Sequence, residues 1–414
     1  MKFAEQRFLK YFLLTLFGLV LIFTRRPDAF LNPQFWAEDG RNWFAQAYNN
    51  SVLTALFTPE AGYFQTISRI IAAVAQIFPF EFAPLIFNLS AIGIKMSVAG
   101  FLLSKRLSNL LPDTPLRFFA AFIYLALPHS YETHANLTNA QWHLAFLAFL
   151  IIIAAPSEKT TGKIFDFAAV SLSAVSGPFC LFLAPIAAIK FWFERDQKTF
   201  GLLMILSFGC AIQAISIFVF PHNRPTVPRG ASLDLFFKII GGHWFLSAIV
   251  GEKGFEFLQN RSIWKNGGSV FVTFFGFAIL IYAFLKSKIE MRLLLVFASL
   301  IIAAALVSPA ISNDIPQWQA MSFPPVGVRY WLVPIFCFLL ALFWLARTDK
   351  NRFVRGFASV LLIAMPIGIV ADWRFPPYKN LDFLRHAAEF RSAETGAEIT
   401  IPINPDWEMR LKKK

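Results

Sequence analysis

The chain has 414 residues, of which 57% are hydrophobic and only 15% are charged. A water-soluble domain carries about 25% charged residues, so soluble enzymes, coiled coils and disordered chains are excluded. The net charge is +13, but the basic residues gather in short clusters between apolar runs. This arrangement is typical of the loops that orient membrane proteins and not of a nucleic-acid-binding surface. Composition therefore predicts an integral membrane protein that has the lipid bilayer as a partner and does not bind nucleic acid.

The first apolar run, Tyr11–Phe23, follows Lys2, Arg7 and Lys10. Arg25-Arg26-Pro27 comes after it instead of a small-residue cleavage site, so we expect an uncleaved first span. The three cysteines all lie within apolar runs and show no metal-ligand spacing, which indicates neither a disulfide framework nor redox chemistry. They are Cys180, Cys210 and Cys337.

A spanning helix needs about 20 mostly apolar residues. About eleven runs approach this length: 8–24, 84–104, 116–129, 140–155, 164–177, 178–193, 200–220, 268–285, 292–308, 330–346 and 355–371. A further run, 64–80, contains Arg69 and is followed by prolines, so we expect it to lie along the membrane face or to dip partly in. The predicted fold is an all-α polytopic membrane domain over 1–371, with membrane-parallel helices in a first outer loop, 25–83.

Basic residues predict the orientation. If the N-terminus is cytoplasmic and the spans alternate, short cytoplasmic loops hold most of the clustered cations, as the positive-inside rule requires. These are Lys2, Arg7 and Lys10; Lys105, Arg106 and Arg117; Lys159 and Lys163; Lys190, Arg195 and Lys198; Lys286, Lys288 and Arg292; and Arg347, Lys350, Arg352 and Arg355. The opposite segments, 25–63, 129–139, 221–267, 309–329 and 372–414, are longer and rich in Trp, Pro, His, Asn and acids. We expect the chemistry on that outer face, with 221–267 a long outer loop and 372–414 a small tail packed on the outer loops.

An acidic pair, Glu38 and Asp39, lies in the first outer loop between Trp36 and Gly40. Carboxylates near a membrane are costly unless they are hydrated, paired or metal-bound. One explanation is structural, with Asp39 as the N-cap of a helix over 41–48. The same loop also holds Tyr63 and Arg69, which favours a functional site.

The second outer loop, 128–139, is densely polar between two apolar runs. Its Glu132 and His134, with Trp142 and His143 at the start of the next span, are candidates for contact with a polar substrate. Asp39, Glu132 and His134 would be the ligands if a metal were bound. Because zinc sites need three or four fixed ligands, hydrogen-bonded histidines are the simpler explanation.

The acidic pair after the first span, the long first outer loop and about eleven spans resemble GT-C-type glycosyltransferases. More narrowly, Glu38-Asp39-Gly40, Gly62-Tyr63 and Arg69-Ile70 resemble uncharacterised bacterial membrane proteins and serotype-modifying glucosyltransferases of that superfamily. The match covers mainly 30–110, with weaker similarity at 136–143 and 402–411. It implies a polyprenyl-phosphate sugar donor, a glycan or lipid acceptor, and an acid of the first outer loop acting as base or metal ligand. Asp39 or Glu38 matches that acid.

General chemistry agrees with this interpretation. Sugar transfer to a hydroxyl needs a base within hydrogen-bond reach, and a departing phosphate needs cations, for which the arginine fork is well suited. We therefore predict an inverting glycosyltransferase of the bacterial inner membrane that faces the periplasm. Asp39 or Glu38 would be the base, and the sugar or acceptor would contact Tyr63, Glu132, His134, Trp142 and His143. The donor phosphate would bind Arg69, Arg329 and Arg224. No cofactor is required, although Mg or Mn is compatible.

Two alternatives remain open. A flippase or transporter of lipid-linked glycans would place ionisable residues at mid-membrane depth, whereas most acids and histidines here lie in loops. Lys95 and Gln213 are exceptions without an evident partner. A polysaccharide polymerase would use the same arginine-bearing outer loops and the same lipid-linked sugars.

Overall fold

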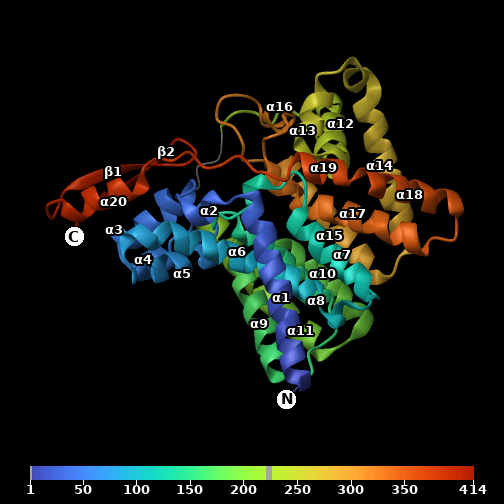
Figure 1. Ribbon diagram of the computed structural model, residues 1–414, viewed down its shortest axis with the longest axis horizontal. Coiled ribbons are helices and arrows are strands. Elements are labelled where there is room, and N and C mark those ends of the chain that lie inside the picture. The colour runs from blue at the N-terminus through green and yellow to red at the C-terminus, as the bar shows by residue number, and fades with distance from the viewer. Residues whose placement is uncertain (1, 221–225) are drawn as a thin grey trace.

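The computed structural model describes residues 2–220 and 226–414. Helices dominate this part of the chain, and its sheet consists of two strands (Figure 1). Arg224, expected from the sequence to bind the donor phosphate, lies outside the described residues.

Seven helical segments among the described residues are long and apolar enough to cross a membrane. They are Phe80–Leu102 (η2 Phe80–Phe82 and α6 Ala83–Leu102), α11 (Gln197–Val219), Leu233–Gln259 (α12 Leu233–Ile239, η5 Ile240–Leu246 and α13 Ser247–Gln259), Trp264–Lys286 (η6 Trp264–Gly268 and α14 Ser269–Lys286), α15 (Ile289–Val307), Val328–Thr348 (η7 Val328–Trp331 and α17 Leu332–Thr348) and Arg352–Ala371 (α18 Arg352–Ala364 and α19 Pro366–Ala371). The predicted all-α membrane architecture agrees with this, while the number of eleven spans stays a prediction.

Helix α1 (Lys2–Arg25) has 24 residues, and its apolar part is the shorter stretch Phe12–Arg25. Further helices have 10 to 15 residues and are α5 (Thr66–Ala75), α7 (Thr114–Ala126), α8 (Ala140–Ile153), α9 (Thr160–Ala174) and α10 (Cys180–Glu194). The run 64–80 was expected to lie along the membrane face or to dip in. Its helix α5 has 10 residues and is therefore about 15 Å long, which is too short to cross a hydrocarbon layer of about 30 Å.

Polar contacts between helices form two separate groups. In one, Arg25 donates to the carbonyls of Leu125 and Leu127 at 2.8 and 2.9 Å, and this group contains the segments predicted to be outer. In the other, Arg106 pairs with Asp166, and Lys190 pairs with Glu290. That second group contains the loops predicted to be cytoplasmic. We call the first the outer-loop group.

The first outer loop folds into short helices: α2 (Asp28–Leu31), η1 (Asp39–Phe44), α3 (Ala45–Asn49), α4 (Val52–Leu56) and α5. An aromatic core joins this loop to the start of α6 and to the tail. Phe35 lies at its centre, with ring centroids 5.3 Å from Phe87 of α6 and 5.5 Å from Phe383 of the tail. The loop is therefore a packed unit rather than a flexible connection.

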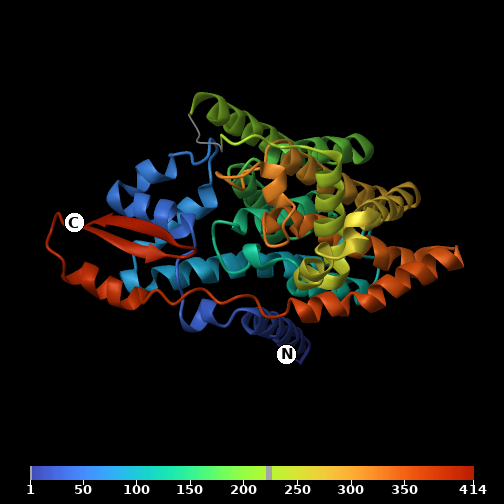
Figure 2. The ribbon, with the colours of Figure 1, turned by 90° about the horizontal axis from the view of Figure 1, so that it is seen from above.

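The tail contains α20 (Phe383–Ser392) followed by the antiparallel strands β1 (Glu398–Ile403) and β2 (Trp407–Lys412). Ile401, Ile403, Met409 and Leu411 are buried, so one face of the hairpin packs on the first outer loop. The backbone N–H of Ala37 donates to the Asn404 carbonyl at 2.5 Å. Both ribbon views place the tail beside the blue helices of that loop (Figures 1 and 2), as the sequence predicted.

The region 221–267 was expected to be an outer loop, but it contains the long helical segment Leu233–Gln259. Residues near both of its ends nevertheless contact the outer-loop group, since Phe236 packs on Trp318 and the Glu252 N–H donates to Asp372 at 2.6 Å. Gly251 breaks this helix with φ 76° and ψ 179°. A Cβ there would lie 2.7 Å from Asp372 Oδ2, so glycine lets the carboxylate approach the backbone.

Candidate functional site

Two buried aspartates hold the second outer loop at its two ends. Asp39 accepts hydrogen bonds from the Leu137 N–H at 3.0 Å and from both the N–H and the hydroxyl of Thr138 at 2.7 Å. Asp372 accepts from the N–H of His129 at 2.8 Å. The loop, including η4 (Tyr131–Thr133), is thereby fixed in position.

Asp39 faces the interior of the protein. It is 1% exposed, and its two oxygens already accept three hydrogen bonds. The N-cap role considered from the sequence is not observed, because the side chain binds residues about a hundred positions away and makes no cap hydrogen bond at η1. As placed, the Asp39 carboxylate positions the second outer loop.

Burial raises the pKa of Asp39 to about 7, despite the opposing hydrogen bonds from Thr138 and Leu137. A folded-state pKa above the ordinary value of 3.8 means that the folded protein binds the proton more tightly than the unfolded chain. The associated stability is full below about pH 4 and is lost as the pH rises through about 7. We expect the Tm in detergent to fall more steeply between pH 4.5 and 7 for the wild type than for Asp39→Asn. Parallel curves would contradict this assignment.

Glu38 has a different environment from its neighbour. Its side chain is partly exposed, and it accepts no hydrogen bond from another side chain that the structure describes. Burial raises the pKa of the Glu38 carboxyl, Arg329 offsets part of the rise, and Glu132 and Glu60 add to it. Four charged groups from three separate loops therefore act on one another here.

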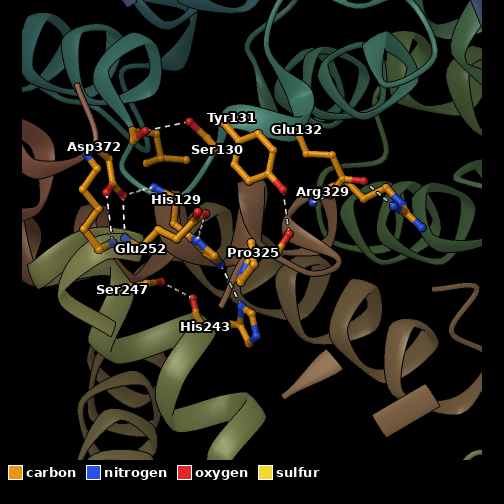
Figure 3. A network of polar contacts seen from close by, with 12 residues as sticks. His129, Ser130, Tyr131, Glu132, His243, Ser247, Glu252, Pro325, Arg329 and Asp372 are labelled. Carbon is orange, nitrogen blue, oxygen red and sulfur yellow. Dashed lines mark hydrogen bonds and ion pairs between the residues drawn. The ribbon is translucent and has the colours of Figure 1, made fainter. Parts of the chain in front are cut away.

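Arg329 and Glu132 form the main ion pair of this neighbourhood (Figure 3). The Arg329 N–H donates to Glu132 Oε2 at 2.8 Å, and the guanidinium pairs with Oε1. Its Nη2 donates to the Ala310 carbonyl at 2.8 Å and contacts the Tyr330 hydroxyl at 3.3 Å. Arginine has five N–H donors, so Nε–H and one Nη1–H have no partner among the described residues.

Arg69 lies in the first outer loop and is 2% exposed. Its guanidinium donates to Gln46 at 2.6 Å and to the Thr58 carbonyl at 3.1 Å, and it lies 4.7 Å from the Trp43 ring centroid. Glu60 is 4.0 Å away. Glu60 and Tyr63 close a tight turn by exchanging backbone hydrogen bonds of 3.0 and 3.2 Å. Arg69 therefore stabilises the loop that presents Glu60 and the partly exposed Tyr63.

The two candidate histidines lie inside the protein. Nδ1 of His134 is 3.2 Å from Lys95 Nζ, which supplies the partner that the sequence did not indicate for that lysine. His143 contacts the Tyr124 hydroxyl and the Thr133 carbonyl. Neither ring contacts Glu132, and no three His, Cys, Asp or Glu side chains in the described ranges are placed to share a metal ion. Asp39, Glu132 and His134 are thus not brought together as a ligand set.

Trp142, another candidate sugar-binding residue, lies beside the ion pair. Its partly exposed ring packs edge-to-face on Tyr330, with centroids 5.5 Å apart, and Tyr330 contacts Arg329. The structure therefore brings Trp142, Glu132 and Arg329 into one region, to which Glu38 is electrostatically coupled.

A chain of hydrogen bonds that sequence reasoning missed lies next to this region (Figure 3). Glu252 is 3.0 Å from Nδ1 of His129, whose Nε2 is 2.8 Å from Nδ1 of His243. Nε2 of His243 is 2.7 Å from the Met321 carbonyl. A carbonyl only accepts, so His243 donates to Met321 and accepts from His129. Sequence separations of 78 to 123 residues hid this arrangement, and polar residues inside an apolar segment were its only signal.

No protein-family model, no curated protein and no solved structure matches the chain. Its function is therefore inferred from its own residues and their geometry.

Proposed function

We propose that the chain is an integral-membrane glycosyltransferase that moves a sugar from a polyprenyl-phosphate donor to a glycan or lipid acceptor at the outer face. The observation that carries this proposal is the Arg329–Glu132 ion pair beside the Trp142–Tyr330 ring contact, with the partly exposed carboxyl of Glu38 in the electrostatic field of both charges. A base and a cation in one neighbourhood are the two groups that transfer from a phosphate leaving group needs.

Glu38 is the base in this proposal. A pKa raised toward neutrality makes a carboxylate a better proton acceptor, and this side chain retains access to solvent. Asp39, the other member of the acidic pair, acts indirectly by fixing the loop that carries Glu132. The acidic pair thus divides into a residue that contacts the acceptor and a residue that positions the site.

Arg329 stabilises the departing phosphate. Two of its N–H groups have no described partner and suit a phosphate oxygen. Glu132 holds the guanidinium and the backbone of Arg329 together, and Trp142 and Tyr63 supply aromatic faces for a sugar. Arg69 is a positioning residue, since its contacts are internal to the loop.

The proposed orientation has the N-terminus in the cytoplasm and the site outside. Support comes from the short basic loops. They belong to the group of polar contacts that contains the Arg106–Asp166 and Lys190–Glu290 pairs, and not to the outer-loop group. Short cytoplasmic loops rich in Lys and Arg are the usual pattern in membrane proteins. We propose a bacterial inner membrane because the resemblance that implies a polyprenyl-phosphate donor is to bacterial membrane proteins.

The test is a transfer assay in phosphatidylcholine nanodiscs. Purified protein is incubated with an extract of bacterial envelope glycans and lipids as acceptors and with undecaprenyl-phosphate glucose, galactose, mannose or arabinose as donor, and release of undecaprenyl phosphate is measured. We expect release from one donor and a loss of about 10²-fold in Arg329→Lys, which lacks the two-pronged fork. Arg374→Lys, an exposed outer-loop arginine bonded to the Thr24 carbonyl, should keep its rate. Intact passage of lipid-linked glycan without release would instead indicate a carrier.

A further inference from the structure

A cavity of about 720 Å³ lies between the tail and the first outer loop, at the left of Figure 1 near α20. Its walls include Phe44 and Phe80, whose rings stack at 5.1 Å, and Phe390, whose centroid is 5.4 Å from that of Phe80. The glycosyl-transfer proposal uses none of these side chains, so the cavity needs its own explanation.

The cavity carries an excess of positive charge. Arg391 and Lys413 line it, with Glu81 as the acidic member of the lining. Arg391 pairs with Glu81, whereas Lys413 makes no ion pair with any carboxylate in the described ranges. Nζ of Lys413 donates to the Arg391 carbonyl at 3.2 Å, and two of its three N–H groups remain. A ligand with negative charge is therefore favoured.

The cavity also lies at the start of a candidate span. Phe80 and Phe82 belong to the first turn of the apolar segment Phe80–Leu102, so this wall is at the membrane boundary. Ile77, Phe78 and Phe82 expose 79%, 51% and 53% of their surfaces. Large apolar side chains exposed beside cations are typical of a surface that dips into lipid.

We propose that this cavity binds the head group of an anionic phospholipid of the surrounding bilayer. The lipid phosphate contacts Arg391 and Lys413, and the acyl chains lie along Phe78 and Phe82. Charge complementarity supports this occupant over a neutral glycan, because the two cations Arg391 and Lys413 outnumber the single carboxylate, Glu81, in the lining. The lipid then fastens the tail to the first outer loop.

The experiment compares lipid binding by native mass spectrometry of the full chain in detergent, titrated with palmitoyl-oleoyl phosphatidylglycerol or phosphatidylcholine. We expect the wild type to prefer the anionic lipid, and Arg391→Ala/Lys413→Ala to weaken that binding roughly 30-fold, from about fivefold for each basic residue at a lipid surface. Lys379→Ala/Arg385→Ala, two exposed tail cations outside the lining, removes the same charge and should bind as the wild type does.

Lys413→Ala alone keeps the Arg391–Glu81 pair and should still lose about fivefold, which guards against a folding defect in the double variant. Equal binding of both lipids by the wild type would overturn the proposal. So would undiminished preference in the Lys413 variant, or saturation of the cavity by an oligosaccharide but not by the anionic lipid. None of these outcomes bears on sugar transfer, so the two proposals can fail separately.

Discussion

Replacing Glu38 with glutamine is expected to lower the rate of sugar transfer by about 10³-fold, the middle of the range for loss of a general base. Glutamine keeps the size and the polar contacts of the side chain but cannot accept a proton. Initial rates in the nanodisc assay with the active donor provide the measurement, and the Tm of the variant should stay within about 2 °C of the wild type because a partly exposed side chain is changed.

Asp39→Asn is the matched control, since it changes the adjacent carboxylate. It places an amide group among donors that need acceptors, so it should lower the Tm clearly while retaining more activity per folded molecule than Glu38→Gln. If Glu38→Gln kept the wild-type rate while Asp39→Asn was stable but inactive, Asp39 would be the base and Glu38 the positioning residue.

The largest effect on stability is expected for Asp372→Ala. This carboxylate accepts from the N–H groups of His129, Glu252 and Lys253 at 2.8, 2.6 and 3.3 Å. An unpaired buried donor costs about 1–3 kcal/mol, so loss of all three should lower the free energy of unfolding by about 3–9 kcal/mol. We expect the Tm in detergent to fall by roughly 10 °C.

A suitable control is Asp314→Ala, an exposed carboxylate on the same side of the protein whose loss should shift the Tm by less than about 1 °C. The Tm of Asp372→Asn should lie between those of the two alanine variants, because its amide oxygen can still accept a hydrogen bond while its NH₂ group faces other donors. Equal Tm values for Asp372→Ala and Asp314→Ala would rule out the anchoring role.

The all-α membrane architecture followed from the sequence, because hydrophobic length is set by the bilayer and can be counted locally. The packing of the tail on the first outer loop was also predicted. The strand β2 was not predicted, although Trp407–Lys412 alternates apolar and charged residues as a half-exposed strand does.

The division of labour between Glu38 and Asp39 was not accessible from the sequence. From the sequence alone, either of two adjacent carboxylates could be the base, because the direction of each side chain depends on the backbone. The helical turn η1 directs the Asp39 side chain inward toward Thr138. The same limit applies to Lys95 and Gln213. Gln213 binds the backbone N–H and carbonyl of Phe64 at 2.8 and 3.1 Å, a partner 149 residues away that only helix packing could supply.

Arg25 and Arg26 depart from the charge bias, since they follow the first predicted span on the proposed outer side. Both are almost fully buried, at 0% and 2% exposure, and donate to backbone carbonyls including those of Leu125 and His134. Phe375 lies 4.0 Å below the Arg25 guanidinium. These cations are structural, so they do not report on topology as loop lysines do.

The contacts of Arg25 also constrain biosynthesis. Its guanidinium donates to the Asp372 carbonyl at 3.3 Å, across 347 residues of sequence, and its own carbonyl accepts from the Phe375 N–H at 3.0 Å. A ribosome must therefore translate nearly the whole polypeptide before α1 can complete its native contacts. Until then Arg25 lacks the partners that the C-terminal segment supplies, and quality-control proteases that sample the nascent chain would meet an incompletely packed first loop throughout elongation.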